Sequence, residues 1–256
     1  EAPYYAVDFL TPPAGARLEV GGVGFLADGR LVASTRRGQV WIITNALADD
    51  PKAATFKLFA EGLHEGLGLE IVNDEIYVLQ RTELSRLRDT DQDGVCDTID
   101  TICNEWGVTP NYHEFGFGLP RDADGNFYAS FNVSFEDKWW HGRSSAPYRG
   151  WVVKIPPTGA VTPMSAGLRS PCGLGRNADG DIFVTENQGD WMPSCGVFHV
   201  KQGRFFSHPA SLNWTDAYVA AGKKSTDTDA PEVPRTAPAL WLPYGWARSA
   251  GNLVAD

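Results

Sequence analysis

Residues 89–100 carry aspartates at positions 1, 3, 5, 9 and 12 of a twelve-residue stretch. An EF-hand calcium loop takes its side-chain ligands from these positions, turns at a glycine in position 6 and uses the carbonyl of position 7. Gly94 and Val95 occupy positions 6 and 7. Five carboxylates this close would repel one another without a cation. The spacing therefore predicts a structural Ca²⁺ ion, with the ligands Asp89, Asp91, Asp93, Val95, Asp97 and Asp100.

Position 12 departs from the EF-hand pattern. This residue is Asp100, whereas the pattern has a glutamate that binds the ion through both carboxylate oxygens. The sequence therefore does not predict that residue 100 binds the ion through both oxygens. The alternative interpretation of the stretch is a solvated acidic turn that holds no ion. In either case the pattern indicates no catalytic chemistry.

The four cysteines, Cys96, Cys103, Cys172 and Cys195, form no C-x-x-C pair, so the usual zinc and haem-attachment spacings are absent. We predict two disulfides, Cys96–Cys103 and Cys172–Cys195; the alternative is four buried thiols. The chain starts at Glu1 without a basic and apolar leader, as expected of a mature exported protein. Both features predict a periplasmic or extracellular location.

Charge and composition restrict the partners. The chain has 22 basic and 32 acidic residues and a formal net charge of −10, which argues against binding to nucleic acid, because phosphates require a basic surface. Hydrophobic residues make up 43% and charged residues 21%, which is typical of a folded globular chain. No apolar run approaches the roughly 18 residues of a membrane span, so no transmembrane segment is predicted.

The elements that must position these residues are strands. The 27 glycines and 17 prolines indicate many turns, and nine tryptophans favour a broad β core. A unit of glycine-rich strand, tight turn and second strand recurs four times, with turns that start at residues 28, 73, 124 and 179, which are 45, 51 and 55 residues apart. Asp-Gly turns of this kind join twisted antiparallel strands, and further strands follow at 40–43, 83–87, 151–155 and 197–200.

Repeats of this period with several strands are typical of the blades of a β-propeller. An irregular β-sandwich is the alternative, but it does not explain a fourfold repeat. The sequence therefore predicts an all-β propeller. Small residues suit the crowded axis where blades converge, so Gly24, Gly68, Gly118 and Gly175 are expected on the innermost strands.

A fifth repeat begins at Trp241, and the sequence stops at Asp256 before that blade is complete. A propeller normally closes on itself, which removes exposed sheet edges. We therefore expect residues 1–256 to form a single β-propeller domain that is incomplete at the C-terminus and belongs to something larger.

The repeats resemble, motif by motif, the soluble glucose/sorbosone dehydrogenase family. The matching stretches are 24–38 for the first blade, 66–69 for the second, 113–128 for the blade of the catalytic histidine, and 168–174 with 183–190 for the next. The most similar subgroup is the bacterial proteins in which such a propeller precedes a cytochrome c-like, haem-binding domain. The resemblance covers most of residues 20–215 and lies in the order of the motifs.

The resemblance implies a six-bladed propeller that uses pyrroloquinoline quinone (PQQ), of which this chain contains about four to five blades. His113 would be the general base that takes a proton from a sugar or polyol hydroxyl while hydride passes to the quinone. Arg169 would stabilise negative charge on the reduced quinone. The backbone at Gln188 and Gly189 would hold a Ca²⁺ ion that polarises the quinone, and a cytochrome c-type protein would accept the electrons.

The sequence departs from the family at two points. Asn132 stands where the family has an aspartate that supports the histidine; an amide orients an imidazole but does not stabilise an imidazolium as an anion would. The later blades, which supply the family's Lys and Arg for the carboxylates of PQQ, lie outside this sequence. Arg36, Arg37, Arg121 and Arg143 are candidate substitutes.

Structural roles are the alternative for each of these residues. His113 could be a hydrogen-bonded structural histidine, and Arg169 could cap a blade turn. His141 lies in an aromatic-rich insertion that could form a funnel wall, and His64 and His199 are interpreted as structural.

Two functions from different classes follow. The first is an exported, PQQ-type dehydrogenase of sugars or polyols. The second is a non-catalytic propeller that serves as a binding or structural subunit of a larger periplasmic or membrane-associated assembly. Asn132 and the early end of the chain favour the second, while His113 and Arg169 favour the first.

Overall fold

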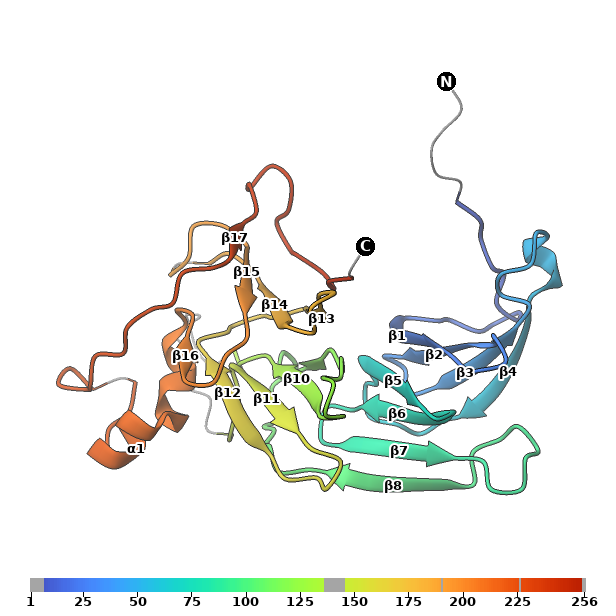
Figure 1. Cartoon of the computed structure of the whole chain (residues 1–256), viewed down its shortest axis with the longest axis horizontal. Helices are drawn as coiled ribbons and strands as arrows, with labels where there is room; N and C mark the ends of the chain where they lie inside the picture. The colour runs from blue at the N-terminus through green and yellow to red at the C-terminus, as the bar shows by residue number, and fades with distance from the viewer. Residues whose placement is uncertain (1–6, 136–145, 190, 226, 255–256) are drawn as a thin grey trace.

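The computed structural model describes residues 7–135, 146–189, 191–225 and 227–254. Four mostly antiparallel sheets follow one another around a common centre, in the chain order from blue to orange in Figure 1. Each sheet is one propeller blade, with its first strand innermost. The predicted all-β propeller is therefore confirmed, with four blades among the described residues.

The first two blades each contain four strands in simple up-and-down order. Blade 1 consists of β1 (Val20–Phe25), β2 (Leu31–Thr35), β3 (Val40–Thr44) and β4 (Thr55–Ala60), with the 3₁₀ helix η1 (Pro51–Ala53) before β4. Blade 2 consists of β5 (Gly68–Val72), β6 (Glu75–Leu79), β7 (Leu84–Arg88) and β8 (Thr98–Cys103).

In the last two blades the outermost strands come from later parts of the chain. Blade 3 consists of β9 (Gly116–Phe117), β10 (Phe127–Phe131), β11 (Trp151–Ile155) and β12 (Thr162–Ala166), and the later strand β16 (Arg204–Phe205) pairs parallel to β12. Blade 4 consists of β13 (Gly173–Arg176), β14 (Ile182–Glu186), β15 (Gly196–His199) and β17 (Leu240–Trp241). The 3₁₀ helix η2 (Pro209–Trp214) and the short helix α1 (Asp216–Ala221) lie between β16 and β17.

Glycines let neighbouring blades approach closely at the centre. Gly24, Gly68 and Gly175 lie on the innermost strands, and Gly118 directly follows β9. A Cβ atom at Gly24 would meet Ile71 of the next blade, one at Gly68 would meet the carbonyl oxygen of Gly118, and one at Gly118 would meet Leu174. The predicted positions of these glycines are confirmed, and the reason is close backbone packing.

The core consists of apolar layers between successive blades. Val32, Val40 and Val78 are fully buried between blades 1 and 2, and Ala129 and Ile155 belong to the cluster that joins blades 2 and 3. A third cluster packs β10 and β11 of blade 3 against blade 4. Blade positions are thus fixed by side chains from both neighbours.

The predicted fifth repeat at Trp241 is wrong. Trp241 lies in β17, which pairs with β15 as the outer strand of blade 4 (Gly196 with Trp241). The segment 250–254 instead packs along β13: the Asn252 side chain accepts the N–H of Leu174 at 3.1 Å, and a Cβ atom at Gly175 would meet the backbone of Leu253.

The two predicted disulfides are absent, because all four cysteines are free thiols. Cys96 precedes β8 and Cys103 ends it, so an extended strand separates them, whereas a disulfide needs Cα atoms within about 7 Å. Cys172 precedes β13 and Cys195 precedes β15, and β14 lies between those strands. The alternative, free and largely buried thiols, describes the structure. Within the described residues, no helix is both long and apolar enough to cross a membrane.

Candidate functional site

His113 and Ser170 meet at the end of the propeller where the chain enters the innermost strands β9 and β13. Nδ1 of His113 lies 2.7 Å from the carbonyl oxygen of Val133, and Nε2 lies 3.0 Å from the Ser170 hydroxyl oxygen. The carbonyl oxygen only accepts, so Nδ1 carries the proton and Nε2 is the acceptor. The ring of Phe135 stacks on the imidazole with centroids 3.5 Å apart.

The imidazole is neutral at pH 7. Burial is the largest cause that lowers the pKa of His113 to about 4; the positive charges of Arg169 and Arg149 lower it further, and the hydrogen bond to Val133 opposes the shift. A neutral imidazole with a lone pair on Nε2 can take a proton from a hydroxyl group placed against it.

Arg169 is adjacent to Ser170 and is only 7% exposed. Its Nη2 atom donates to the Gln188 carbonyl oxygen at 2.8 Å, and its guanidinium carbon lies 5.0 Å from the centre of the Trp191 ring. The structure thus brings together three of the residues singled out in the sequence, His113, Arg169 and Gln188, although 75 positions separate the first from the last.

Glu186, at the end of β14, holds the segment that carries Arg169 and Ser170. This residue is completely buried, and its carboxylate accepts the backbone N–H groups of Arg169 at 2.5 Å, Ser170 at 3.0 Å and Asn187 at 2.7 Å. Burial raises the pKa of Glu186 to about 7, against the lowering effect of those hydrogen bonds and of the Arg169 charge. We did not predict Glu186 from the sequence; a charged residue at the end of an apolar strand was the available signal.

Asn132 does not support His113 as expected. It is 4% exposed, its N–H donates to the Phe115 carbonyl at 3.1 Å, and its side-chain oxygen has no hydrogen-bond partner among the described residues. The neighbouring Val133 carbonyl takes the place of the anionic partner that the family resemblance led us to seek. A backbone carbonyl fixes the tautomer but brings no negative charge.

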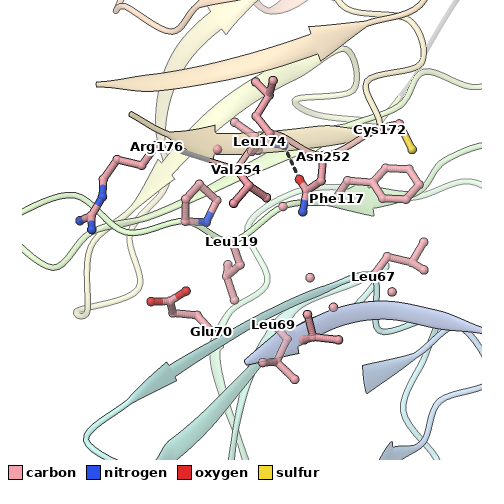
Figure 2. Close-up of a pocket in the computed structure, with 18 of the residues that line it drawn as sticks. Leu67, Leu69, Glu70, Phe117, Leu119, Cys172, Leu174, Arg176, Asn252 and Val254 are labelled. Atoms are coloured by element: carbon pink, nitrogen blue, oxygen red, sulfur yellow. Dashed lines mark hydrogen bonds between the residues drawn. The ribbon is translucent and has the colours of Figure 1, made fainter. Parts of the chain in front are cut away.

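The centre of the propeller contains a cavity of about 540 Å³, lined by the innermost strands of all four blades and by 252–254. Figure 2 shows Cys172 and Phe117 toward one end and Glu70 and Arg176 toward the other. Because Ser170 is two residues before Cys172, the His113 cluster belongs to the first end. At the other end, burial raises the pKa of Glu70, and the positive charges of Arg121 and Arg176 oppose this shift.

The candidate substitutes for the missing cations are spread out. Arg36 lies 5.2 Å from the Phe115 ring centre, on the side of His113, whereas Arg37 pairs with Glu19 at 2.8 Å. Arg121 lines the central cavity with Arg176. Residues Arg143 and His141 lie outside the described part of the chain. Of the described candidates, Arg36 is therefore the one placed beside the His113 cluster.

His64 and His199, interpreted as structural from the sequence, have ordinary contacts. The backbone N–H of His64 donates to the Gln80 side chain, and Nε2 of His199 lies 3.0 Å from Asp181 on the outer hairpin of blade 4.

The acidic loop lies between β7 and β8, away from this cluster. One carboxylate oxygen from each of Asp89, Asp91 and Asp97 lies within 4.8 Å of the other two. The loop is ordered by backbone donors: Gly94 N–H bonds to Asp89 at 2.7 Å, and Thr90 N–H bonds to Asp97 at 2.6 Å. The three oxygens lie close enough together to contact one cation, and one oxygen of Asp89 is buried without a hydrogen-bond partner among the described residues.

Two of the predicted ligands lie apart from that group. Asp100 lies in β8, which begins at Thr98, and is placed opposite Arg86, where it forms ion pairs with Arg86 at 3.1 Å and Arg88 at 2.8 Å. Asp93 accepts the Val95 N–H at 2.8 Å and is not in the cluster of three. The loop is shorter than the twelve-residue pattern, because a strand replaces its last turn.

Solved structures with the same fold are sugar dehydrogenases at low sequence identity. A putative oxidoreductase (glucose dehydrogenase) from Thermus thermophilus is 19% identical, with a TM-score of 0.58 over 75% of this chain and 66% of that one. The PQQ-bound aldose sugar dehydrogenase of Streptomyces coelicolor is also 19% identical, with a TM-score of 0.58 over 78% and 65%. The soluble aldose sugar dehydrogenase of Escherichia coli is 12% identical, with a TM-score of 0.56 over 74% and 62%. This chain therefore spans less than two thirds of the length of these neighbours.

No curated protein matches the sequence. One family model does, over residues 24–237, and its description is "Domain of unknown function (DUF7133)". That match covers most of the chain, from the end of β1 to the segment before β17, and includes the His113 cluster. The chain belongs to the DUF7133 family.

Proposed function

We propose that this chain is the propeller of an exported dehydrogenase that oxidises a hydroxyl group of a sugar or related polyol with PQQ. One observation carries the proposal: His113 is a neutral base, locked in one tautomer, beside the buried cation Arg169. The fold shared with PQQ-type sugar dehydrogenases supports it. The electrons would pass to a cytochrome c-type protein or to another member of a larger assembly.

In this proposal His113 removes the hydroxyl proton. Its Nε2 accepts a hydrogen bond from Ser170 in the structure, and a substrate hydroxyl would take the place of that donor. Val133 keeps the proton on Nδ1, so Nε2 always faces the substrate as an acceptor. The Phe135 ring holds the plane of the imidazole and keeps water from one of its faces.

The residues fit the reacting part of PQQ. PQQ, when bound, would accept the hydride. Arg169 would meet the negative charge that this transfer places on the cofactor, because its guanidinium is held by Gln188 and Trp191. Arg36, half exposed on the same side of the propeller, would be the cation for a cofactor carboxylate, which would compete with Glu65, the ion-pair partner of Arg36 at 3.4 Å.

A Ca²⁺ ion at Gln188 fits less well. The Gln188 carbonyl accepts a hydrogen bond from Arg169, so a cation already lies against the oxygen that the ion would use. Calcium at this point would require the Arg169 side chain to turn away. We therefore propose Ca²⁺ in a structural role at Asp89, Asp91 and Asp97, where three carboxylates converge.

The activity test compares His113→Ala with His199→Ala, a histidine on the outer hairpin of blade 4. Each purified protein is supplied with PQQ and Ca²⁺, and aldose-dependent reduction of a dye is measured. We expect the wild type and His199→Ala to be active, and His113→Ala to lose at least about a hundredfold in kcat with an unchanged melting temperature. Wild-type protein that oxidises no aldose or polyol under these conditions would favour the non-catalytic propeller instead.

A further inference from the structure

His113 lies on a stretch of chain that no sheet holds. Residues 104–115 join β8 to β9 without forming a strand, and Tyr112, next to His113, is 67% exposed. A backbone outside helices and strands must find its hydrogen bonds in side chains, turns or water. A catalytic base has to be held within about 0.5 Å of its working position, so the contacts that fix residues 107–115, here called the histidine loop, decide whether His113 is in place.

The Arg149 side chain closes the histidine loop at both ends. Its Nε donates to the Gly107 carbonyl oxygen at 2.8 Å, and its Nη1 donates to the Phe115 carbonyl oxygen at 2.9 Å. A third contact, from Nη2 to the Arg81 carbonyl oxygen at 3.4 Å, ties the loop to the hairpin between β6 and β7. A guanidinium holds its donors in a rigid planar fork, so one side chain can bind several carbonyls at fixed spacing. His113 therefore lies between two points that Arg149 holds together.

This arrangement is costly to build. Arg149 is completely buried, and removing a charged group from water is unfavourable unless hydrogen bonds replace the water. Burial lowers the pKa of Arg149 to about 10, and Glu114 opposes this shift, so the guanidinium stays charged at pH 7. The preceding residue, Tyr148, has a φ of 60°, in the left-handed region that disfavours a bulky side chain. Strained backbone of this kind is concentrated at functional sites.

Hydrogen bonds within the loop connect these anchors to the imidazole. The Asn111 side-chain oxygen accepts the N–H groups of His113 at 3.0 Å and Phe135 at 3.2 Å, and Nδ2 of Asn111 donates to the Phe135 carbonyl oxygen at 2.7 Å. The ring of Phe135 stacks on the imidazole. Arg81, in turn, donates to the Asn111 carbonyl oxygen. His113 and the ring that covers it thus share one anchor, which depends on the path of the loop.

We propose that Arg149 is a positioning residue for His113: its guanidinium sets the spacing of Gly107 and Phe115, and the loop between them keeps the imidazole against Val133. The inference rests on the proposed function for what His113 does, but not for how His113 is held. The geometry of the guanidinium is what matters here, because a point charge at the same place would bind only one of the two carbonyls.

The test separates this geometry from the charge. Arg149→Lys keeps a positive charge but offers a single nitrogen, whereas Arg149→Met removes both the charge and the donors. Val32→Ala is the matched control, because it opens a cavity in the buried cluster between blades 1 and 2 and lowers stability without touching the histidine loop. Nitrogen-15 NMR of the free protein, without cofactor, measures which nitrogen of His113 carries the proton and the pKa of the ring.

We expect the wild type and Val32→Ala to keep the proton on Nδ1 and a His113 pKa of about 4. In both Arg149 variants the loosened loop should expose the ring to water, so both tautomers appear and the pKa rises toward 6.5, although Arg169 remains. A single Nδ1–H tautomer with an unchanged pKa in Arg149→Lys would overturn the proposal. So would the same tautomer mixture in Val32→Ala, because general destabilisation would then explain the effect.

Activity gives a second reading that can fail separately. With PQQ, Ca²⁺ and an aldose, kcat should fall about 10- to 100-fold in both Arg149 variants and stay unchanged in Val32→Ala, because a misplaced base costs rate. An unchanged kcat in Arg149→Lys would overturn the proposal. A wild type that oxidises nothing, but shows the expected NMR result, would contradict the proposed function and leave the role of Arg149 supported.

Hydrogen exchange in the wild type decides the question if neither Arg149 variant folds. An N–H group held against a buried carbonyl exchanges slowly with water. Nε–H of Arg149 should therefore exchange at least about a hundredfold more slowly than Nε–H of the exposed Arg204. Equal exchange rates would show that Arg149 does not hold the loop.

Discussion

His113 and Glu186 are two buried ionisable groups with opposite pKa shifts, joined through the Ser170 segment. The pKa of His113 is lowered from 6.5 to about 4, and that of Glu186 is raised from 4.5 to about 7. Between pH 4.5 and 6.5 the unfolded chain therefore binds more protons at position 113, and the folded chain binds more at position 186. The two residues push the free energy of unfolding in opposite directions as the pH rises.

Glu186→Gln should separate these two contributions. The raised pKa of Glu186 makes its contribution to stability fall as the pH rises from 4.5 to 7, whereas that of His113 rises from about 4 to 6.5. With Glu186 removed, the free energy of unfolding should rise with pH between 4.5 and 6.5 more steeply than in the wild type. Urea unfolding at pH 4.5, 5.5 and 6.5 measures these slopes. Glu232→Gln, at an exposed position, is the control. Equal slopes in the two variants would show that the pKa of Glu186 is not raised in the folded protein.

In the loop between β7 and β8, the carboxylates accept hydrogen bonds from the loop's own backbone. A substitution that removes the charge of one carboxylate but keeps its acceptor oxygen therefore tests whether the loop binds an ion. Asp97 accepts the Thr90 N–H and Thr90 hydroxyl, and an asparagine oxygen can still accept both. Asp97→Asn should therefore keep the loop folded but weaken Ca²⁺ binding at least about tenfold, because the site loses a charged ligand. Calorimetric titration with Ca²⁺ measures this effect. Asp124→Asn, in the turn of blade 3, should bind like the wild type; a wild-type protein that takes up no Ca²⁺ would contradict the proposal.

The cost of replacing a glycine on an innermost strand depends on how closely the next blade approaches it. A Cβ atom at Gly68 would collide with the Gly118 carbonyl oxygen, which is backbone and cannot swing aside. Gly68→Ala should therefore lower the free energy of unfolding by about 3 kcal/mol or more. At Gly245 a Cβ atom would meet nothing within 4 Å, so Gly245→Ala should be nearly neutral. Chemical denaturation of both variants gives the comparison; similar stabilities would show that the blades do not pack this closely.

The sequence predicted the blades well, because each hairpin is encoded locally. Asp-Gly at 28–29, 124–125 and 179–180 places a glycine with positive φ in the turn, and Asn73 and Asp74 adopt φ values of 51° and 64° in the same role. The glycines of the innermost strands were predictable for a different reason: neighbouring blades approach closely at the centre, and only small residues fit there.

Contacts between blades were less predictable. The prediction of a Cys172–Cys195 disulfide is wrong because residue spacing does not reveal that β14 lies between the strands that follow these two cysteines. Asp100 lies apart from the three clustered carboxylates because the strand β8 begins inside the acidic pattern. The support of His113 by the Val133 carbonyl comes from a backbone atom, which carries no signature in the sequence.

At the scale of the whole molecule, four blades bring segments far apart in sequence to one end of a central cavity. His113 enters from the start of blade 3, Arg169 and Ser170 from the start of blade 4, and Arg36 from blade 1. This arrangement explains how a simple repeat of strand and turn brings together the base His113, the buried cation Arg169 and the hydroxyl of Ser170. The free thiols remove the disulfide argument for an oxidising compartment, so the exported location stays a prediction.

The most direct test of the proposed PQQ site is binding of the cofactor itself, without substrate. PQQ is titrated into the wild type and Arg169→Met in the presence of Ca²⁺, and binding is followed by calorimetry and by the visible absorbance of the quinone. The account predicts one PQQ per chain for the wild type and at least about tenfold weaker binding for Arg169→Met, because a buried guanidinium beside the quinone is replaced by an uncharged side chain. No binding to the wild type, or equal affinity in the two proteins, would contradict it.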